Sequence, residues 1–78
     1  METYRNLGGD SNVVRYKIEE GSITIEFKSG ANRFYLYDAA HPGAEHVKQL
    51  QALALVGQGL NSYIGRNLRH PTSYSKRW

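Results

Sequence analysis

Residues 22–37 read SITIEFKSGANRFYLY, and this stretch decides the fold that the sequence predicts. Two runs of β-branched and aromatic residues flank Ser29-Gly30 and alternate apolar with polar side chains, which is typical of a β-hairpin closed by a two-residue turn. Because successive side chains of a strand point to opposite faces, this turn gives one apolar face and one charged and aromatic face. The predicted partners across the turn are Ile23 with Leu36, Thr24 with Tyr35, Ile25 with Phe34, and Glu26 with Arg33.

The run that precedes the hairpin fits the same sheet. Across a Glu20-Gly21 turn, the predicted partners are Ile18 with Ile23, Tyr16 with Ile25, Arg15 with Glu26, and Val14 with Phe27. Residues 13–19, 22–28 and 31–37 therefore share one register as an antiparallel meander. The side chains predicted for its inner face are those of Val14, Tyr16, Ile18, Ile23, Ile25, Phe27, Phe34 and Leu36.

Two helices are predicted after the meander. The first runs from Pro42 to Val56, because proline suits a first helical turn and apolar residues recur on one arc. Leu55 and Val56 lie off the centre of that arc, which indicates either a wide buried face or a surface for a partner. Gly57-Gln58-Gly59 ends this helix. A second helix from Leu60 to about Leu68 then presents apolar residues at every fourth position.

We therefore expect an α+β fold, in which a three-stranded antiparallel β-meander is followed by two C-terminal helices packed on one sheet face. Residues 13–69 form the single domain of this prediction. A flexible lead-in at residues 1–12 precedes it, and a basic aromatic tail at residues 70–78 follows it.

Composition restricts the class of protein. The 78 residues include no cysteine, so neither disulfides nor thiolate metal sites contribute to stability. No apolar run approaches the length of a membrane-spanning helix or follows the pattern of a secretory signal. We therefore expect a soluble cytoplasmic protein with no membrane partner.

The net charge of +3 is concentrated at one end of the chain. Residues 66–78 carry four basic side chains and no acidic one, whereas the rest of the chain has six basic side chains against seven acidic ones. A basic end is typical of contact with nucleic acid, although a solubilising tail has the same composition.

With strands and helices placed, the chain resembles the KTSC domain, a small module named after the C-terminal extension of certain lysyl-tRNA synthetases and also found as short standalone bacterial proteins. The matching segments are Ser11-Asn12-Val13, Tyr16, ITIEFKSG at residues 23–30, Tyr35-Leu36-Tyr37, and Gly57 with Leu60-Asn61 and Ile64. The resemblance implies a strand-rich module packed on C-terminal helices, without catalytic activity. Its association with the synthetases implies an RNA-binding role.

No residues form a recognisable catalytic or metal-binding motif. His41 and His46 are five residues apart, so they do not share a helix face as metal ligands spaced by four do. No serine occurs in the context of a nucleophile elbow. We therefore expect no catalytic residue, no metal and no cofactor, and predict a binding module rather than an enzyme.

Two kinds of binding remain open. The first is RNA binding, because tyrosines on a sheet stack exposed bases and neighbouring cations meet phosphates. The second is protein interaction or self-association, through Leu55 and Val56 or through an edge strand at residues 35–37. The residues predicted to bind nucleic acid are Arg15, Lys17, Arg33, Tyr35, Tyr37, Arg66, Arg69, Lys76 and Arg77.

Overall fold

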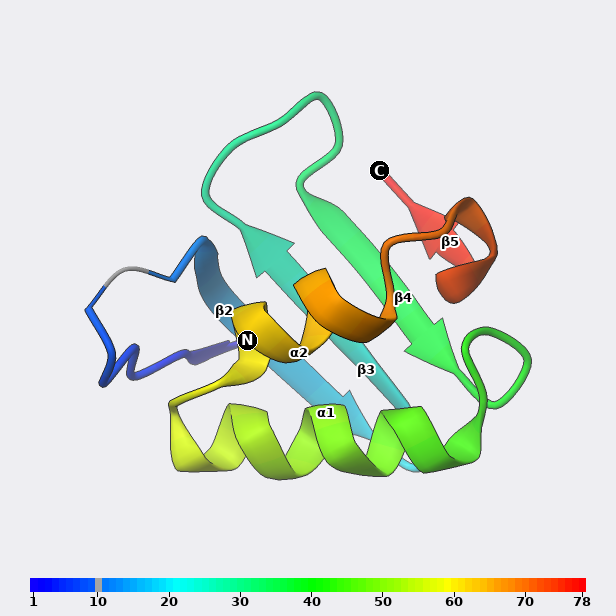
Figure 1. Cartoon of the computed structure of the whole chain (residues 1–78), viewed down its shortest axis with the longest axis horizontal. Helices are drawn as coiled ribbons and strands as arrows, with labels where there is room; N and C mark the ends of the chain where they lie inside the picture. The colour runs from blue at the N-terminus through cyan, green and yellow to red at the C-terminus, as the bar shows by residue number, and fades with distance from the viewer. Residues whose placement is uncertain (10) are drawn as a thin grey trace.

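One antiparallel sheet and two helices make up the computed structural model, which describes residues 1–9 and 11–78 (Figure 1). The strands lie in the order β1-β2-β3-β4-β5, and both helices pack on the same face of the sheet. The α+β class is confirmed, but the sheet has five strands rather than three. The elements are β1 (Glu2–Thr3), β2 (Val13–Glu19), β3 (Ser22–Phe27), β4 (Phe34–Asp38), α1 (Ala44–Val56), α2 (Leu60–Asn67), the 3₁₀ turn η1 (Pro71–Ser73) and β5 (Lys76–Arg77).

The predicted pairing of β2 with β3 is confirmed over most of its length. Ile18 lies opposite Ile23, and Tyr16 lies opposite Ile25. A β-bulge between Val13 and Arg15 shifts the register at the start of β2. Val13 rather than Val14 is therefore paired with Phe27, and the Val13 side chain is buried. The prediction of Val14 as the inner residue is wrong, because an extra residue in one strand reverses the alternation beyond it.

The predicted pairing of β3 with β4 is wrong by one residue. Ile25 lies opposite Tyr35 rather than Phe34, and Ile23 lies opposite Tyr37 rather than Leu36. The connection is a loop at residues 28–33, which the Phe27 N–H closes by donating to the Arg33 carbonyl at 2.7 Å. A shift of one residue turns every side chain of a strand to the other face.

The two faces of β4 are therefore exchanged relative to the prediction. Tyr37 is 2% exposed and belongs to the core, and half-buried Tyr35 packs against that core. Phe34 and Leu36 lie on the other face, which the helices leave uncovered. The alternation of FYLY is aromatic or aliphatic in both phases, so the hydrophobic pattern by itself did not distinguish them.

Both chain ends join the sheet. β1 pairs with β2, and the Tyr4 side chain that follows β1 is only 4% exposed. β5 pairs with β4, and Phe34 and Trp78 exchange two backbone hydrogen bonds of 2.9 Å. The N-terminal segment thus contributes to the core. β4 lies between two strands, so the prediction of an edge strand at residues 35–37 is wrong.

The helices form the second layer. α1 begins at Ala44, two residues later than predicted, and buries Val47, Leu50 and Ala54 against the sheet. Its end is capped from a distant segment, because the Arg5 guanidinium donates to the carbonyls of the last turn. In the described part of the chain, neither helix is long and apolar enough to cross a membrane.

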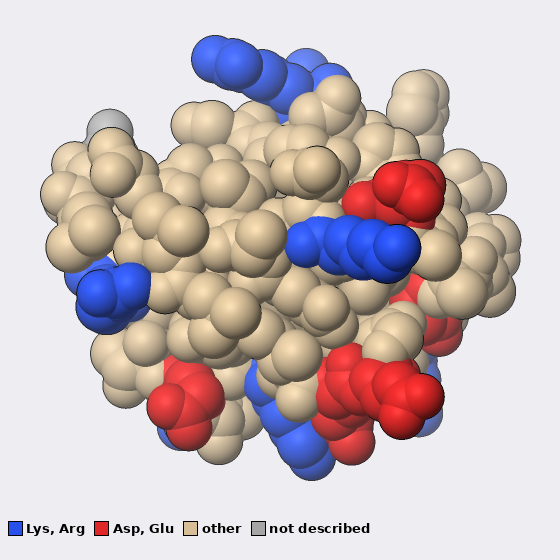
Figure 2. Space-filling view, turned by 90° about the horizontal axis from the view of Figure 1, so that it is seen from below, with Lys and Arg blue, Asp and Glu red and all other residues tan. Residues whose placement is uncertain are grey.

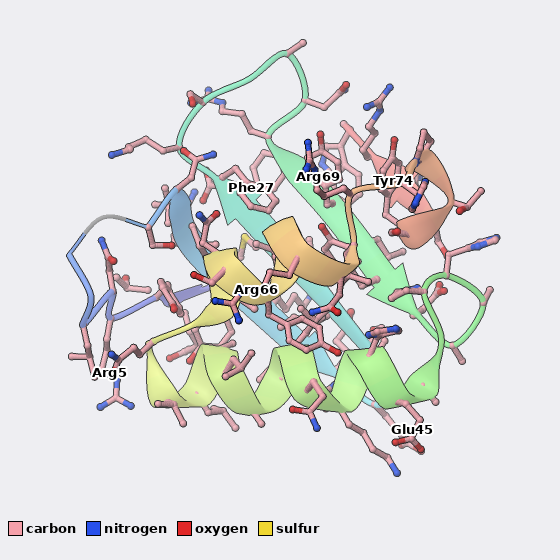
Figure 3. The ribbon with its side chains drawn as sticks, viewed as in Figure 1. Arg5, Phe27, Glu45, Arg66, Arg69 and Tyr74 are labelled. Carbon is pink, nitrogen blue, oxygen red and sulfur yellow. The ribbon has the colours of Figure 1, made fainter. Side chains whose placement is uncertain are left out.

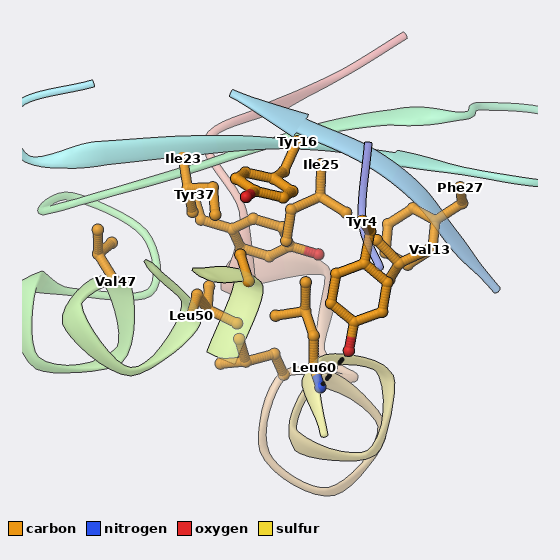
Figure 4. Close-up of a cluster of buried hydrophobic side chains, with 12 residues drawn as sticks. Tyr4, Val13, Tyr16, Ile23, Ile25, Phe27, Tyr37, Val47, Leu50 and Leu60 are labelled. Atoms are coloured by element: carbon orange, nitrogen blue, oxygen red, sulfur yellow. Dashed lines mark hydrogen bonds between the residues drawn. The ribbon is translucent and has the colours of Figure 1, made fainter. Parts of the chain in front are cut away.

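The core lies between these two layers (Figure 4). The Tyr4 hydroxyl accepts a hydrogen bond from the Leu60 N–H at 3.2 Å, which joins the first residues of the chain to the start of α2. The buried apolar side chains are those of Tyr4, Val13, Tyr16, Ile23, Ile25, Phe27, Tyr37, Val47, Leu50, Ala54, Leu60 and Leu68.

Candidate nucleic-acid interface

The nine residues predicted to bind nucleic acid do not share one surface. Because the register of β4 differs from the prediction, Tyr35 and Tyr37 lie on the helix-covered side of the sheet, while Arg15 and Lys17 of β2 lie on the opposite side. The C-terminal cations are also divided, since Lys76 is paired with Leu36 and Arg77 with Tyr35. Two separate surfaces result, one on each side of the sheet.

The first surface, which we call the outer face, consists of Arg15, Lys17, Thr24, Glu26, Phe34, Leu36, Lys76 and Trp78. Cross-strand pairing places Lys17, Leu36 and Lys76 in one row of this face. The neighbouring row contains Arg15, Phe34 and Trp78. Side chains on the same side of adjacent strands are direct neighbours, so Lys76 lies next to the aromatic rings, whereas Glu26 separates Arg15 from Phe34 and Thr24 separates Lys17 from Leu36.

An aromatic pair is the central feature of the outer face. The Phe34 and Trp78 rings are stacked with their centroids 5.7 Å apart and their planes 11° from parallel. The Lys76 ammonium lies 5.7 Å from the centroid of the Trp78 ring. Trp78 remains 48% exposed. Sequence reasoning missed this pair because β5 is only two residues long and has no periodicity that would predict it.

One acidic side chain reduces the positive charge of the outer face. Glu26 forms an ion pair with Arg15, whose hydrogen bond lowers the pKa of the carboxyl group, and the charges of Arg15 and Arg33 lower it further. Glu26 is therefore ionised at neutral pH and offsets one cation. Within the described residues this is the only ion pair, so Lys17, Arg33 and Lys76 keep their charges available.

The second surface is a pocket on the helix side of the sheet, between the β3–β4 loop and the segment that follows α2. Its volume is about 510 Å³. Four of the nine predicted residues, Tyr35, Tyr37, Arg69 and Arg77, contribute to its lining. Figure 3 shows Phe27, Arg69 and Tyr74 around this region. We call it the tyrosine pocket and define it by Phe27, Tyr35, Tyr37, Arg69, Tyr74 and Arg77.

Two of the predicted residues belong to neither surface. Arg66 is exposed on α2 and does not line the pocket, and Arg33 lies in the β3–β4 loop close enough to influence Glu26. On the side of the molecule that carries α1, basic side chains stand singly and acidic ones lie beside several of them (Figure 2). The described residues of that side therefore form no continuous basic band.

The histidines do not form a metal centre in the part of the chain that the structure describes, where no three His, Cys, Asp or Glu side chains are grouped to hold an ion. His46 of α1 instead hydrogen-bonds the Tyr63 hydroxyl of α2 at 2.6 Å. This histidine therefore links the two helices.

Comparison of the chain with protein-family models, with curated proteins and with solved structures found no match.

Proposed function

We propose that this protein is a non-catalytic binding module that takes up single-stranded RNA on its outer face. The observation that supports this most strongly is the Phe34–Trp78 stack, with Trp78 about half exposed on a sheet face that neither α1 nor α2 covers. An exposed aromatic step on a sheet is the usual platform for unstacked bases, because every base has a π-face.

Charge on the outer face and in the adjoining β3–β4 loop supports the proposal. Lys76 lies beside the Trp78 ring, Lys17 lies on the same face two strands away from Phe34, and Arg33 immediately precedes Phe34 in the chain. If these three cations each meet one phosphate, the logarithm of RNA affinity falls with the logarithm of salt concentration at a slope of about −2. The resemblance to the KTSC domain, with its implied RNA-binding role, favours the same function.

Intrinsic fluorescence tests the proposal directly, because Trp78 is the only tryptophan. Titration with an unlabelled single-stranded oligoribonucleotide at low salt should quench this fluorescence. Trp78→Ala should weaken binding of a labelled oligonucleotide about tenfold, the order expected for one lost base–aromatic contact. Lys76→Gln should reduce the salt slope by about 0.7.

Lys48 is exposed on α1, and Lys48→Gln is the matched control. This variant should leave both the RNA affinity and its salt slope unchanged. An absence of both quenching and binding at tens of micromolar RNA would rule the function out. If Lys76→Gln and Lys48→Gln lower the RNA affinity equally, the binding is a non-specific charge attraction, and this result would contradict the assignment of the outer face.

A protein-interaction module is the second candidate, supported by exposed apolar side chains at the end of α1. Leu55 and Val56 are 59% and 53% exposed. Exposed Leu7 lies beside them, since its N–H donates to the Gly57 carbonyl at 2.8 Å. Self-association through this patch predicts a mass that rises with concentration in light scattering and falls on Leu55→Glu. A monomer at all concentrations would exclude it.

A further inference from the structure

The tyrosine pocket has aromatic walls. The Tyr35 ring meets Phe27 edge-on, with centroids 5.3 Å apart and planes at 90°, and meets Tyr74 in the same way at 5.0 Å and 88°. At about 510 Å³ the pocket falls in the size range of small-molecule sites. Rings fixed in this way hold their positions and offer both faces and edges to a planar molecule.

A buried phenol at the pocket has hydrogen-bonding capacity to spare. Tyr37 is 2% exposed, yet none of the hydrogen bonds among the described residues involves its hydroxyl. In the described chain, every side-chain nitrogen or oxygen that is fully shielded from solvent has a hydrogen-bond partner. The Tyr37 hydroxyl has none, so it is still accessible, and Tyr37 contributes to the lining of the pocket. Burial raises the pKa of Tyr37, so the phenol stays neutral and can donate a hydrogen bond.

The charge of the pocket is entirely positive. Arg69 and Arg77 are the charged residues among its described lining, which contains no aspartate or glutamate. The Arg77 guanidinium lies 5.5 Å from the centroid of the Tyr74 ring. Neither arginine takes part in an ion pair within the described residues. Guanidinium groups bind phosphate oxygens through paired N–H donors, so two of them beside aromatic walls suit a phosphorylated planar ligand.

We propose that the tyrosine pocket binds a nucleotide, with the base against Tyr35 and Tyr74, an edge of the base on the Tyr37 hydroxyl, and the phosphate at Arg69 and Arg77. The ligand is either a free mononucleotide or the phosphorylated end of an RNA chain. The pocket lies on the opposite side of the sheet from Trp78, so this proposal does not depend on RNA binding by the outer face.

Chemical-shift mapping with the four ribonucleoside monophosphates tests the proposal. Each nucleotide that binds should shift the amide signals of the β3–β4 loop and of residues 68–77. Inorganic phosphate and the unphosphorylated nucleosides, used as separate probes, should shift the same signals much less. Absence of shifts at a few millimolar nucleotide, or equal shifts with phosphate alone, would overturn the proposal.

Matched variants locate the site. Arg69→Gln should raise the Kd of the nucleotide about tenfold, as expected for a lost charge-assisted hydrogen bond. Tyr37→Phe, which removes only the hydroxyl, should raise it about fivefold. The control is Arg66→Gln, since Arg66 is exposed on α2 three residues before Arg69 but does not line the pocket. Equal effects of Arg69→Gln and Arg66→Gln would contradict the proposal.

A competition assay between the mononucleotide and RNA distinguishes the two ligands, the free nucleotide and the phosphorylated RNA end. A short RNA with a 5′-phosphate that displaces the mononucleotide more strongly than the same RNA with a 5′-hydroxyl identifies an RNA end as the ligand. Equal and weak displacement by both identifies the free nucleotide. The same assay on Trp78→Ala separates the surfaces, because nucleotide binding should persist in that variant even where RNA binding by the outer face is lost.

Discussion

Single residues of this protein have properties that depend on contacts far along the chain. Tyr37 is almost completely buried and its pKa is raised, chiefly by desolvation and further by the neighbouring phenols Tyr35 and Tyr74. Tyr4 is buried although it is only the fourth residue, because its ring packs in the core and its hydroxyl accepts a hydrogen bond from the Leu60 N–H of α2. Both tyrosines therefore contribute to stability in ways that can be measured.

Tyr37 should make the protein sensitive to alkaline pH. Its pKa is higher in the folded state than the value near 10 of an unfolded chain. The stabilisation is therefore complete below about pH 10 and is lost as pH rises towards the folded-state pKa, by up to about 1.4 kcal/mol per pH unit. Urea unfolding at several pH values should show this decline. In Tyr37→Phe the decline should be shallower, and an unchanged slope would contradict the burial of this phenol.

Tyr4→Ala should cost about 3–5 kcal/mol of unfolding free energy, as for other large aromatic side chains removed from a core. Tyr4→Phe should cost about 1–2 kcal/mol, because the Leu60 N–H would lose its acceptor. Leu7→Ala, at a 60% exposed position of the same segment, is the control and should change stability by less than about 0.5 kcal/mol. Thermal or urea unfolding of the three variants provides the comparison.

Among the secondary-structure elements, the ends of α1 and of the sheet depend most on tertiary contacts. Gly57 ends α1 in the left-handed conformation, with φ 83°, and a Cβ atom there would lie 2.7 Å from the Arg5 Cβ. β5 is held by β4, as shown by the paired backbone bonds of Phe34 and Trp78. Substitutions at the end of α1 and hydrogen exchange in β5 therefore test these tertiary contacts.

Gly57→Ala should destabilise the protein by at least about 1–3 kcal/mol, since it combines an unfavourable φ with a steric clash against the chain near Arg5. The matched control is Gly65→Ala within α2, where an added Cβ meets nothing within 4 Å. This control should increase stability by about 0.5–1 kcal/mol, because alanine favours a helix interior. Similar effects of the two substitutions would contradict the described helix end.

Amide hydrogen exchange should report β5 as an ordered strand. The N–H groups of Phe34 and Trp78 both donate across the β4–β5 edge at 2.9 Å, so both should exchange more slowly than the amide of Gly30 in the β3–β4 loop. Trp78→Pro would remove one of these donors and should reduce the protection of the amides along the β4–β5 edge. Exchange of the Trp78 amide as fast as that of Gly30 would support a disordered tail instead.

At the scale of the whole molecule, the fold places two different surfaces on the two sides of one thin sheet. Adjacent residues of β5 point in opposite directions, so Lys76 contributes to the outer face and Arg77 to the tyrosine pocket. Opposite sides of β4 likewise supply Phe34 to the outer face and Tyr35 to the pocket. We therefore expect variants of one surface to leave ligand binding at the other unchanged.

The sequence by itself determined the elements that have enough residues to show a period. Alternation over seven residues and the Glu20-Gly21 turn established β2, β3 and most of their register, and apolar spacing with the glycines at 57 and 59 established α1 and α2. These patterns act locally, so a strand or helix face can be read from neighbouring residues.

Only the tertiary structure decided the facing of β4, the existence of the two short edge strands, and the convergence of site residues. Either phase of FYLY could have supplied a hydrophobic face, and the packing of Tyr37 among the buried side chains selected one of them. β1 and β5 have two residues each and exist because a neighbouring strand supplies their hydrogen bonds. Tyr35, Arg69 and Arg77 line one pocket because contacts distant in the sequence bring their segments together. Strand pairing joins Tyr35 to Arg77, and the packing of Leu68 in the core places Arg69 beside them.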